Sequence, residues 1–478
     1  MKRYLAPLTI ALCVSIATSA LAKNVPVFRA GAAAIDISPR DFPVNMPGGF
    51  SANFAEKNHD PLHARAIVLD DGSIAVAIVL VDNLGISRDT LDIAKSLAAK
   101  KCGIPPERML ISSTHTHTAP SASVTQGPPA SVAYRELVID GIVQAITKAH
   151  DNLRPAMIGA AAHPLPEEVF NRRWFLKPGE MPLNPFGEID LVKMNPGTSP
   201  KALLHPAGPI DPDVSVIAIN DAKSRRPLAI YANYSLHYVG GVPPGQVSAD
   251  YFGEFARLMP FRVNAGADFV AMMSNGTSGD INNIPFIVGR PPREPFEQIR
   301  IVAGKAADAA WHARNAISQY HSDARLGMLQ REIGLKTRKP SAEQIAWAKS
   351  ILAMSEEERA KQPRLAEAYA RRTLALAEAD ETTKVLLQAI RIGPDIAVCA
   401  IPFETFAETG LDLKKRSPFP RTIVVSIANG YHGYLPTPEQ HKLGGYETWL
   451  GTNRVEKDAS VIISNHLLEM LAELAKSQ

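Results

Sequence analysis

Two histidines separated by one residue, His115 and His117, stand in the segment Ser-Ser-Thr-His-Thr-His-Thr-Ala-Pro at residues 112–120. The apolar run Met-Leu-Ile directly before it predicts a β-strand. Side chains two residues apart lie on the same face of a strand, so both imidazoles would point together beyond its end. Imidazole is a common metal ligand and a common general base near neutral pH. A pair of hydrogen-bonded loop histidines would give the same spacing.

The same pattern recurs along the chain, because other polar or aromatic residues also follow apolar runs that predict strands. These residues are His237, Asp280, Glu404, Tyr431 and Tyr434. In open α/β sheets, ligands bind at the carboxyl ends of strands, where several loops converge. Two histidines, a glutamate and a tyrosine could hold a borderline cation such as zinc, which in catalytic sites activates a water. A core histidine, a glutamate near a helix end and a packed tyrosine would also explain these residues one by one.

Two other arrangements offer competing chemistry. Ser278, in Gly-Thr-Ser-Gly at residues 276–279, is similar to a nucleophile elbow but lacks the Gly-x-Ser-x-Gly spacing. It leaves a serine esterase open as an alternative. His59 and His63 are four residues apart, as in a helical zinc site. Pro61 lies between them and the flanking pattern is typical of strands, so we do not assign them to a metal.

The elements that must position these residues alternate between strand and helix, which predicts an α/β fold with mixed sheets flanked by helices. Residues 61–69 and 74–81, joined by a turn with Asp-Gly, predict a hairpin. Other predicted strands span 29–39, 109–112, 214–219, 228–234, 269–273, 396–401 and 423–427. Predicted helices span 87–101, 132–150, 251–259, 293–320, 341–380 and 459–476. The proline-rich residues 152–208 are predicted as loops, and residues 23–478 as a single large catalytic domain.

The first 22 residues predict an export signal. Lys2 and Arg3 precede an apolar stretch, and Ala20 and Ala22 are the small residues of a cleavage site. A retained membrane anchor is the alternative, although Pro7 interrupts a stretch of marginal spanning length. The expected location is periplasmic or secreted, after cleavage near Ala22. Loss of the two basic residues lowers the formal net charge from +3 to +1, so charge gives no reason to expect a nucleic-acid partner.

Length and composition describe a globular chain. With 478 residues and 46% hydrophobic content, it can bury a large core. Of three cysteines, Cys13 would leave with the signal. Cys102 and Cys399 could pair in an oxidising compartment, but Cys399 lies in an apolar run and we expect it to be a buried thiol. No Cys-x-x-Cys pattern occurs, so a metal site must use histidine, carboxylate or tyrosine ligands.

Taken together, these segments resemble the catalytic domain of the neutral, non-lysosomal ceramidases, which are zinc-dependent amidases. The resemblance extends from Gly31 to Glu447, nearly the whole predicted mature chain. The first matching segments are Asp-Pro-Leu-His-Ala-Arg-Ala-Ile-Val-Leu-Asp-Asp-Gly at 60–72, Ser-Thr-His-Thr-His at 113–117, Asn-Arg at 171–172 and Leu-His at 236–237. The others are Ser-Ala-Asp at 248–250, Gly-Asp-Ile at 279–281, Pro-Phe-Glu-Thr at 402–405, Tyr-Leu-Pro-Thr at 434–437 and Tyr-Glu at 446–447.

The resemblance implies two groups of site residues. The zinc ligands would be His115, His237, Glu404 and Tyr434. The residues that act on the substrate would be His117 as acid/base, with Arg172 and Tyr446 as donors to the carbonyl oxygen. A zinc-activated water needs a base for its proton, and a tetrahedral oxyanion needs donors already in place. The implied reaction is hydrolysis of a ceramide-like N-acyl amide or a related acyl bond, in a small-molecule or lipid substrate, with peripheral contact to a membrane surface.

The chain departs from the family pattern at several positions. Asn282 stands where the family has a functionally important serine. Asparagine cannot be a nucleophile, but its amide could hydrogen-bond an oxyanion or a water, so Asn282 stays among the candidate catalytic residues. Pro436 and His441 replace a threonine and a tyrosine, and we do not expect the family's C-terminal immunoglobulin-like domain. The change at Asn282 leaves open a non-catalytic relative that binds a lipid or a glycan.

Overall fold

The computed structural model describes residues 27–49, 53–126, 128–199 and 201–477. The predicted export signal at residues 1–22 lies outside these ranges. Within them, no helix combines the length and the apolar character that crossing a membrane requires.

The largest sheet of the described residues has eight strands and is called the first sheet below. Its strands, in spatial order, are β16 (Val270–Asn275), β14 (Pro227–Tyr234), β13 (Asp213–Asp221), β8 (Arg154–Pro164), β1 (Arg29–Asp36), β5 (His63–Asp70), β6 (Ala75–Val81) and β7 (Met109–Ser113). The β6–β7 and β14–β16 pairs are parallel, while the other neighbours are antiparallel. The sheet is therefore mixed, as predicted, and β5 and β6 form the predicted hairpin.

A second sheet packs against one face of the first. It contains β18 (Leu326–Lys336), β19 (Thr382–Ile392), β20 (Ile396–Ala400) and β22 (Arg421–Val425), with β20 and β22 parallel. Ile78 and Met272 of the first sheet share one buried apolar cluster with Ile390 and Val398 of the second. The two sheets thus enclose a common core.

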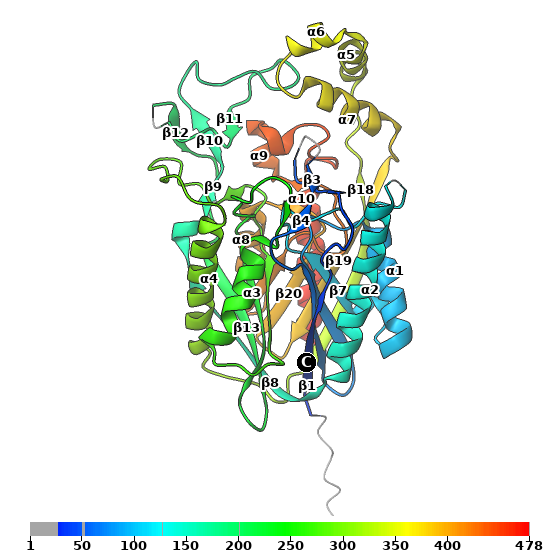
Figure 1. Cartoon of the computed structure of the whole chain (residues 1–478), viewed down its shortest axis with the longest axis vertical. Coiled ribbons are helices and arrows are strands. Elements are labelled where there is room, and N and C mark those ends of the chain that lie inside the picture. Colours follow the sequence, from blue (N-terminus) through cyan, green and yellow to red (C-terminus); the bar gives the residue numbers. More distant parts are fainter. Residues whose placement is uncertain (1–26, 50–52, 127, 200, 478) are drawn as a thin grey trace, which may run out of the picture.

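Helices cover the outer faces of both sheets. On the first sheet these are α1 (Arg88–Cys102), α2 (Pro129–Asp151), α3 (Asp250–Arg262) and α4 (Glu297–Asn315), and on the second α8 (Ala407–Arg416) and α10 (Ala459–Lys476). Figure 1 shows α1 and α2 over one half of the first sheet and α3 and α4 over the other. The order of layers is helix, sheet, sheet, helix, which confirms the predicted fold class.

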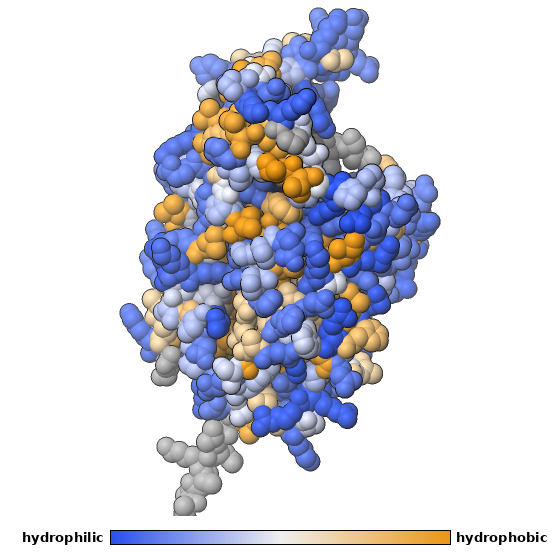
Figure 2. Space-filling model, turned by 90° about the vertical axis from the view of Figure 1, so that its left-hand side faces the viewer, coloured by the Kyte–Doolittle hydropathy of each residue, from blue (hydrophilic) through white to orange (hydrophobic). Residues whose placement is uncertain are grey.

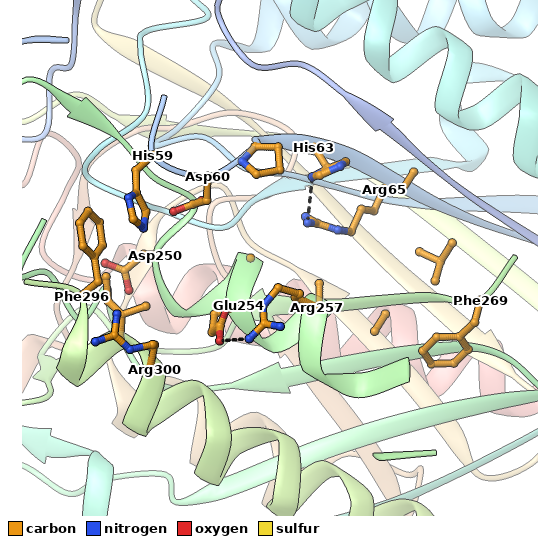
Figure 3. Close-up of a pocket in the computed structure, with 17 residues that line it drawn as sticks. His59, Asp60, His63, Arg65, Asp250, Glu254, Arg257, Phe269, Phe296 and Arg300 are labelled. Atoms are coloured by element: carbon orange, nitrogen blue, oxygen red, sulfur yellow. Dashed lines mark hydrogen bonds and ion pairs between the residues drawn. The ribbon is translucent and has the colours of Figure 1, made fainter. Parts of the chain in front are cut away.

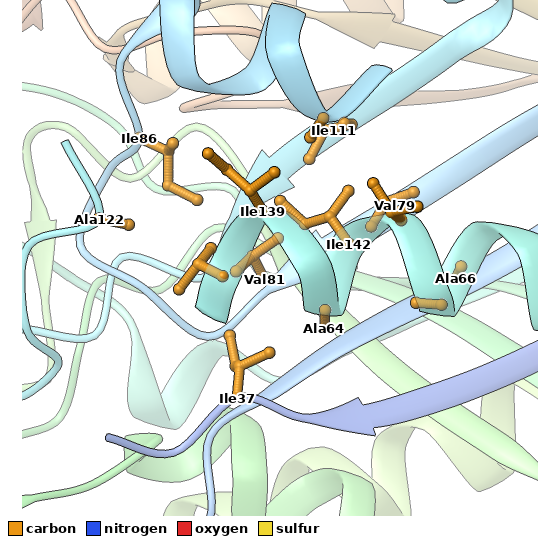
Figure 4. Close-up of a cluster of buried hydrophobic side chains, with 14 of the residues drawn as sticks. Ile37, Ala64, Ala66, Val79, Val81, Ile86, Ile111, Ala122, Ile139 and Ile142 are labelled. Atoms are coloured by element: carbon orange, nitrogen blue, oxygen red, sulfur yellow. The ribbon is translucent and has the colours of Figure 1, made fainter. Parts of the chain in front are cut away.

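Strand β6 shows why its sequence is apolar throughout. Val79 and Val81 pack against Ile139 and Ile142 of α2 (Figure 4), whereas Ile78 points into the core between the sheets. Successive side chains of a strand alternate between its faces, so a strand covered on both faces needs apolar residues at every position.

Short elements surround the ends of the strands. The two- and three-stranded sheets pair β9 (Phe170–Asn171) with β17 (Ile281–Asn282), β21 (Glu404–Thr405) with β23 (Tyr434–Leu435), β4 (Lys57–Asn58) with β15 (Gln246–Val247), β2 (Val44–Asn45) with β3 (Phe54–Ala55), and β10 (Arg173–Leu176) with β11 (Val192–Met194) and β12 (Leu203–Pro206). The short helix α9 (Pro438–Leu443) follows β23. Several candidate site residues lie in these small sheets, so pairing in the small sheets rather than in the two large ones fixes their backbone.

The single helix predicted over residues 341–380 is wrong. The segment forms α5 (Ala342–Ala353), α6 (Glu356–Ala360) and α7 (Ala366–Glu378), which Figure 1 shows at one end of the molecule. Ser355 caps the N-terminus of α6, because its side chain accepts a hydrogen bond from the backbone N–H of Glu358 in a capping box. Pro363 stands between α6 and α7, where its ring prevents a continuous helix.

Other predictions fail in part. The segment 152–208, predicted as loops, contains β8, a strand in the interior of the first sheet. Its alanines and prolines have low strand propensity, and pairing with β13 overrides that preference. Helix α4 is shorter at both ends than predicted, and β18 and β19 are not among the predicted strands. Cys399 is a buried thiol, as predicted, and Cys102 is also unpaired.

Candidate metal centre

The loops that leave three parallel strand pairs meet at one end of the two sheets. The backbone N–H of Ser113, at the end of β7, donates to the carbonyl of Ile427, which follows β22. Ser426 in turn donates to the carbonyl of Asn275, at the end of β16. These bonds join the two sheets at their carboxyl ends, so the polar residues after each strand converge as the sequence predicts.

Three imidazoles lie together at this point. The Nε2 atoms of His115 and His117 are 3.3 Å apart, and the ring of His237 is 4.7 Å from that of His115. One ring nitrogen from each of the three lies within 4.8 Å of the other two, a grouping that can hold a metal ion. His115 and His237 are each 1% exposed.

The geometry of the His-x-His pair differs from the predicted one. Strand β7 ends at Ser113, and His115 has a φ of 69°, in the left-handed region that few residues other than glycine adopt. The rings of His115 and His117 are therefore not parallel on one strand face but meet at 89°. The turn after the strand, rather than the strand pleat, brings the two Nε2 atoms together.

Backbone carbonyls orient all three rings. The Nδ1 atoms of His115, His117 and His237 lie 2.6, 2.7 and 3.0 Å from the carbonyl oxygens of Leu84, Gly48 and Ser278 respectively. A carbonyl oxygen only accepts, so each Nδ1 carries the proton and each Nε2 presents a lone pair. Such outer hydrogen bonds fix the tautomer of metal-binding histidines.

Glu404 completes the group. Its Oε2 atom lies 3.3 Å from Nε2 of His115 and 3.6 Å from Nε2 of His237, while its Oε1 accepts a 2.6 Å hydrogen bond from the Tyr431 hydroxyl. Among the described residues, no donor reaches Glu404 Oε2 or His237 Nε2, although both atoms are buried. Buried acceptors without a donor are rare in folded proteins.

These atoms fit a cation. Three imidazole lone pairs and a carboxylate oxygen face one another, and a positive ion between them would satisfy all four. Atoms bound to one tetrahedral zinc lie about 3.3 Å apart, because the bonds are about 2.0–2.1 Å long. The separations of 3.3 and 3.6 Å around Glu404 match that spacing. The donor set can therefore bind a metal.

The electrostatics favour the same protonation state. Burial and the neighbouring His115 lower the pKa of His117 to about 3, and burial lowers that of His237 well below its ordinary value. Burial alone would raise the pKa of Glu404, but positive charge at His115 and His237 and the hydrogen bond from the Tyr431 hydroxyl hold it below its ordinary value. A metal ion bound between these groups would supply the positive charge in place of a proton. Neutral imidazoles around an ionised carboxylate are the form that binds metal.

Arg172, Tyr434 and Tyr446 lie beside this group. The Arg172 guanidinium donates to the Tyr434 hydroxyl at 3.0 Å, to the Gly279 carbonyl at 2.8 Å and to Glu447 at 2.9 Å. The rings of Tyr434 and Tyr446 are 5.5 Å apart. Burial raises the pKa of Tyr446 to about 12, so its hydroxyl keeps its proton and can donate. The structure thus brings the predicted donors next to the predicted ligands.

Asn282 lies on a short strand outside the group of imidazoles. It belongs to β17 and pairs with Phe170 of β9. Its amide donates to the side chain of Asn195 and accepts from the backbone N–H of Ile284 at 2.9 Å. The backbone N–H of Asn195 donates to the carbonyl of Arg172, so Asn282 is linked to the site through this neighbour.

The two remaining candidates have other partners. The Ser278 hydroxyl donates to the Asn275 side chain at 2.6 Å, and the nearby His237 Nδ1 is turned toward the Ser278 carbonyl. His237 Nδ1 lies 3.5 Å from the Ser278 hydroxyl oxygen, but it carries the proton that points to the carbonyl, so it cannot act as the base that a serine hydrolase needs at its nucleophile. Asp280 accepts from Asn171 and from the backbone of Ala407, away from the imidazoles, and its burial raises its pKa to about 7.

Sequence reasoning assigned no role to two residues that shape the centre, Glu447 and Tyr238. Glu447 is fully buried and accepts from both Arg172 and Arg173. The ring of Tyr238 stacks on His117, with centroids 3.8 Å apart. Glu447 belongs to the matching Tyr-Glu segment at 446–447, which could have marked it, whereas adjacency to His237 was the only signal for Tyr238.

No protein-family model and no curated protein sequence matches this chain. Solved structures do match it. The neutral ceramidase from Pseudomonas aeruginosa superposes with a TM-score of 0.70 at 17% sequence identity, covering 94% of this chain and 75% of that one. A ceramidase complexed with C2 superposes with a TM-score of 0.70 at 16% identity, covering 94% of this chain and 76% of that one. The chain therefore has the fold of the neutral ceramidases, as its sequence motifs predict.

Proposed function

We propose that this chain is a zinc-dependent hydrolase that cleaves a ceramide-like N-acyl amide. The observation that carries the proposal is a group of facing acceptor atoms, the three imidazole nitrogens and the Glu404 oxygen. Two of them, His237 Nε2 and Glu404 Oε2, are buried and receive no donor from the described residues. The fold shared with neutral ceramidases supports the choice of an amide bond.

His115, His237, Glu404 and Tyr434 would hold the zinc. Bound zinc would supply Lewis acidity, which lowers the pKa of a water and polarises a carbonyl group. Burial raises the pKa of Tyr434 well above its ordinary value, and the Arg172 guanidinium, 3.0 Å from the Tyr434 hydroxyl, opposes this shift and would favour the ionised form as a ligand. Tyr431 keeps Glu404 in place through its hydrogen bond to Oε1, leaving Oε2 directed at the imidazoles.

His117 would carry the proton. Its Nδ1 is held by the Gly48 carbonyl and its ring is stacked on Tyr238, so its Nε2 lone pair is fixed toward the centre. From this position, Nε2 can take a proton from the attacking water and deliver it to the departing amine. His117 also belongs to the metal-binding group, and the metal content of His117→Ala distinguishes a base from a ligand.

Arg172 and Tyr446 would stabilise the oxyanion. The hydrogen bonds of Arg172 to Gly279 and Glu447 hold its positive charge before the substrate arrives. Donors that are already oriented in a site shielded from water can lower the barrier by about 3–4 kcal/mol each.

The surroundings of Tyr446 suit an apolar acyl chain. A cavity of about 340 Å³ adjoins it, lined by residues that include Met181, Pro182, Leu183 and Trp449. Exposed apolar side chains continue outward along the nearby segments, namely Leu183, Ile189, Leu191, Leu204, Ile287 and Val288. Figure 2 shows hydrophobic residues gathered on the upper part of this face. We therefore propose a lipid substrate and peripheral contact with a lipid surface. We also propose that the protein is exported, for which the N-terminal sequence is the support.

The test pairs metal analysis with a substrate panel. Purified protein should contain stoichiometric zinc, and His115→Ala and His237→Ala should lose both zinc and hydrolysis of N-acyl amides. The panel should include ceramide, short N-acyl amides and esters, and should compare the wild type with Asn282→Ser. A well-folded protein that never retains zinc would contradict the proposal, and zinc binding without turnover would identify a non-catalytic binder. Sequencing the N-terminus of the mature protein tests export.

A further inference from the structure

The short segment of residues 248–251 lies between the loop that carries His117 and the loop that carries His237. Its far side borders a cavity of about 370 Å³, separate from the metal centre, which Asp60 and Asp250 both line. Figure 3 shows these two carboxylates at the same end of the cavity, beside His59 and Phe296. The hydrogen bonds of this segment connect it to both histidine loops.

One set of bonds reaches the loop of His117. The carbonyl oxygen of Ser248 accepts from the hydroxyls of Thr116 and Thr118, at 2.8 and 3.0 Å. The backbone N–H of Ser248 donates to the Thr118 carbonyl at 3.0 Å. Thr116 and Thr118 are the two neighbours of His117, so the segment holds this loop on both sides of the imidazole.

A second set reaches the loop of His237. The carboxylate of Asp250 accepts from the backbone N–H groups of Val239 and Gly240, at 3.0 and 2.9 Å. The Tyr251 hydroxyl donates to the carbonyl of Leu236 at 3.1 Å. These contacts lie on either side of His237, and Asp250 is buried at 2% exposure.

Asp60 connects the hydrogen bonds to the His117 loop with those to the His237 loop. It lies between β4 and β5, far from the segment in sequence. Its Oδ2 accepts from the Ser248 hydroxyl at 2.6 Å and its Oδ1 from the backbone N–H of Ala249 at 2.7 Å. The hydroxyl oxygen of Ser248 also accepts a hydrogen bond from the backbone N–H of Asp250. One carboxylate therefore orders the turn from which both loops are held.

We propose that Asp60 and Asp250 are positioning residues that, through residues 248–251, fix the imidazoles of His117 and His237 relative to each other. The inference rests on the proposed function in so far as both imidazoles serve one metal centre. Neither carboxylate is among the residues that would touch metal or substrate. A metal site tolerates little displacement of its ligands, and loss of outer hydrogen-bond partners typically weakens metal binding by about 10–100-fold.

Carboxylate-to-amide changes test this with little change in shape. Asp250 has a φ of 54°, and asparagine tolerates the left-handed region, so Asp250→Asn should not strain the backbone. The new NH₂ group cannot accept from a backbone N–H, so one of the bonds to Val239 or Gly240 is lost. In Asp60→Asn the NH₂ group can only donate to the Ser248 hydroxyl, so this bond is reversed and loses the strength that the charged acceptor gives it. Glu254→Gln is the matched control, because Glu254 lines the same cavity and its side chain pairs with Arg257 instead.

Two measurements on the full chain are needed. Calorimetric titration of metal-stripped protein with Zn²⁺ should show a dissociation constant about 10–100-fold higher in Asp60→Asn and Asp250→Asn than in the wild type and Glu254→Gln. Hydrogen exchange of the metal-free proteins should show faster exchange in residues 114–118 and 236–240 of both variants. Near-ultraviolet circular dichroism confirms folding, and Asp60→Asn, at a less buried position, carries the test if Asp250→Asn does not fold.

Wild-type exchange in both loops of the folded variants would overturn the positioning role, whether or not the protein binds zinc. Wild-type zinc affinity in both variants would overturn it equally. If the wild type binds no zinc while exchange in the variants rises in both loops, the positioning role stands and the proposed zinc centre fails.

Discussion

The Nε2 atom of His115 lies 3.3 Å from the Oε2 atom of Glu404, and both atoms present lone pairs to the same point. With His117, which is half-buried, and the buried His237, they form a group of acceptors held by backbone carbonyls and Tyr431. Two acceptors at this distance repel each other unless a proton or a cation lies between them. The four acceptors therefore need a bound positive charge to stay this close together.

Glu404→Gln should separate metal binding from stability. Because Tyr431 fixes Oε1, the amide NH₂ of glutamine would replace Oε2 and could donate to an imidazole Nε2. We expect this variant to lose metal. The free energy of unfolding of its metal-free form should be about 1–3 kcal/mol higher than that of the metal-free wild type. Urea unfolding of chelator-treated proteins measures the difference. Equal stabilities of the two metal-free proteins would show that the acceptors do not repel each other.

His117→Ala should distinguish a proton carrier from a ligand. If His117 is the base, the variant keeps stoichiometric metal but loses hydrolysis by about 10²–10⁴-fold. His115→Ala, the comparison at the other end of the motif, should lose metal and activity together. Metal content by mass spectrometry and rates on one N-acyl amide decide the matter, and loss of metal from His117→Ala would make it a ligand.

Glu447→Ala should be strongly destabilising. Glu447 is fully buried and neutralises both Arg172 and Arg173, at 2.9 and 2.7 Å. Removing it leaves buried charge without a partner, and we expect the free energy of unfolding to fall by about 3–5 kcal/mol. Glu439→Ala, which breaks the exposed pair with Lys442, should change it by less than about 1 kcal/mol. Similar values for the two variants would mean that water reaches the buried arginines.

Asp280 should make stability fall as pH rises. Burial raises its pKa in the folded protein to about 7 from an ordinary value of 3.8, so the folded state binds this proton more tightly than the unfolded state. Its contribution is fully present below about pH 4 and is lost as pH rises toward 7, at about 1.4 kcal/mol per pH unit. Asp280→Asn should remove this component of the pH dependence. Denaturant unfolding from pH 4 to 8 measures it, and unchanged slopes in the variant would contradict the assignment.

The sequence by itself determined where chemistry could occur. Continuous apolar runs predicted β6, β7, β14 and β20, because strands covered on both faces need apolar residues throughout. The residues that follow these runs, among them His115, His237 and Glu404, lie together for the reason that the pattern implied. The spacing of apolar residues along a segment indicates which face a side chain occupies and where the element ends. A few neighbouring residues contain this information.

Only the tertiary structure decided how those residues are held. The carbonyl of Gly48 orients His117, Glu447 bridges two arginines, and Asp60 reaches Ser248 across 188 positions of the chain. The same holds for β8, whose alanines become a strand because β13 and β1 pair with it. Each of these contacts depends on packing between distant segments, and no local pattern specifies which distant partner a polar group will meet.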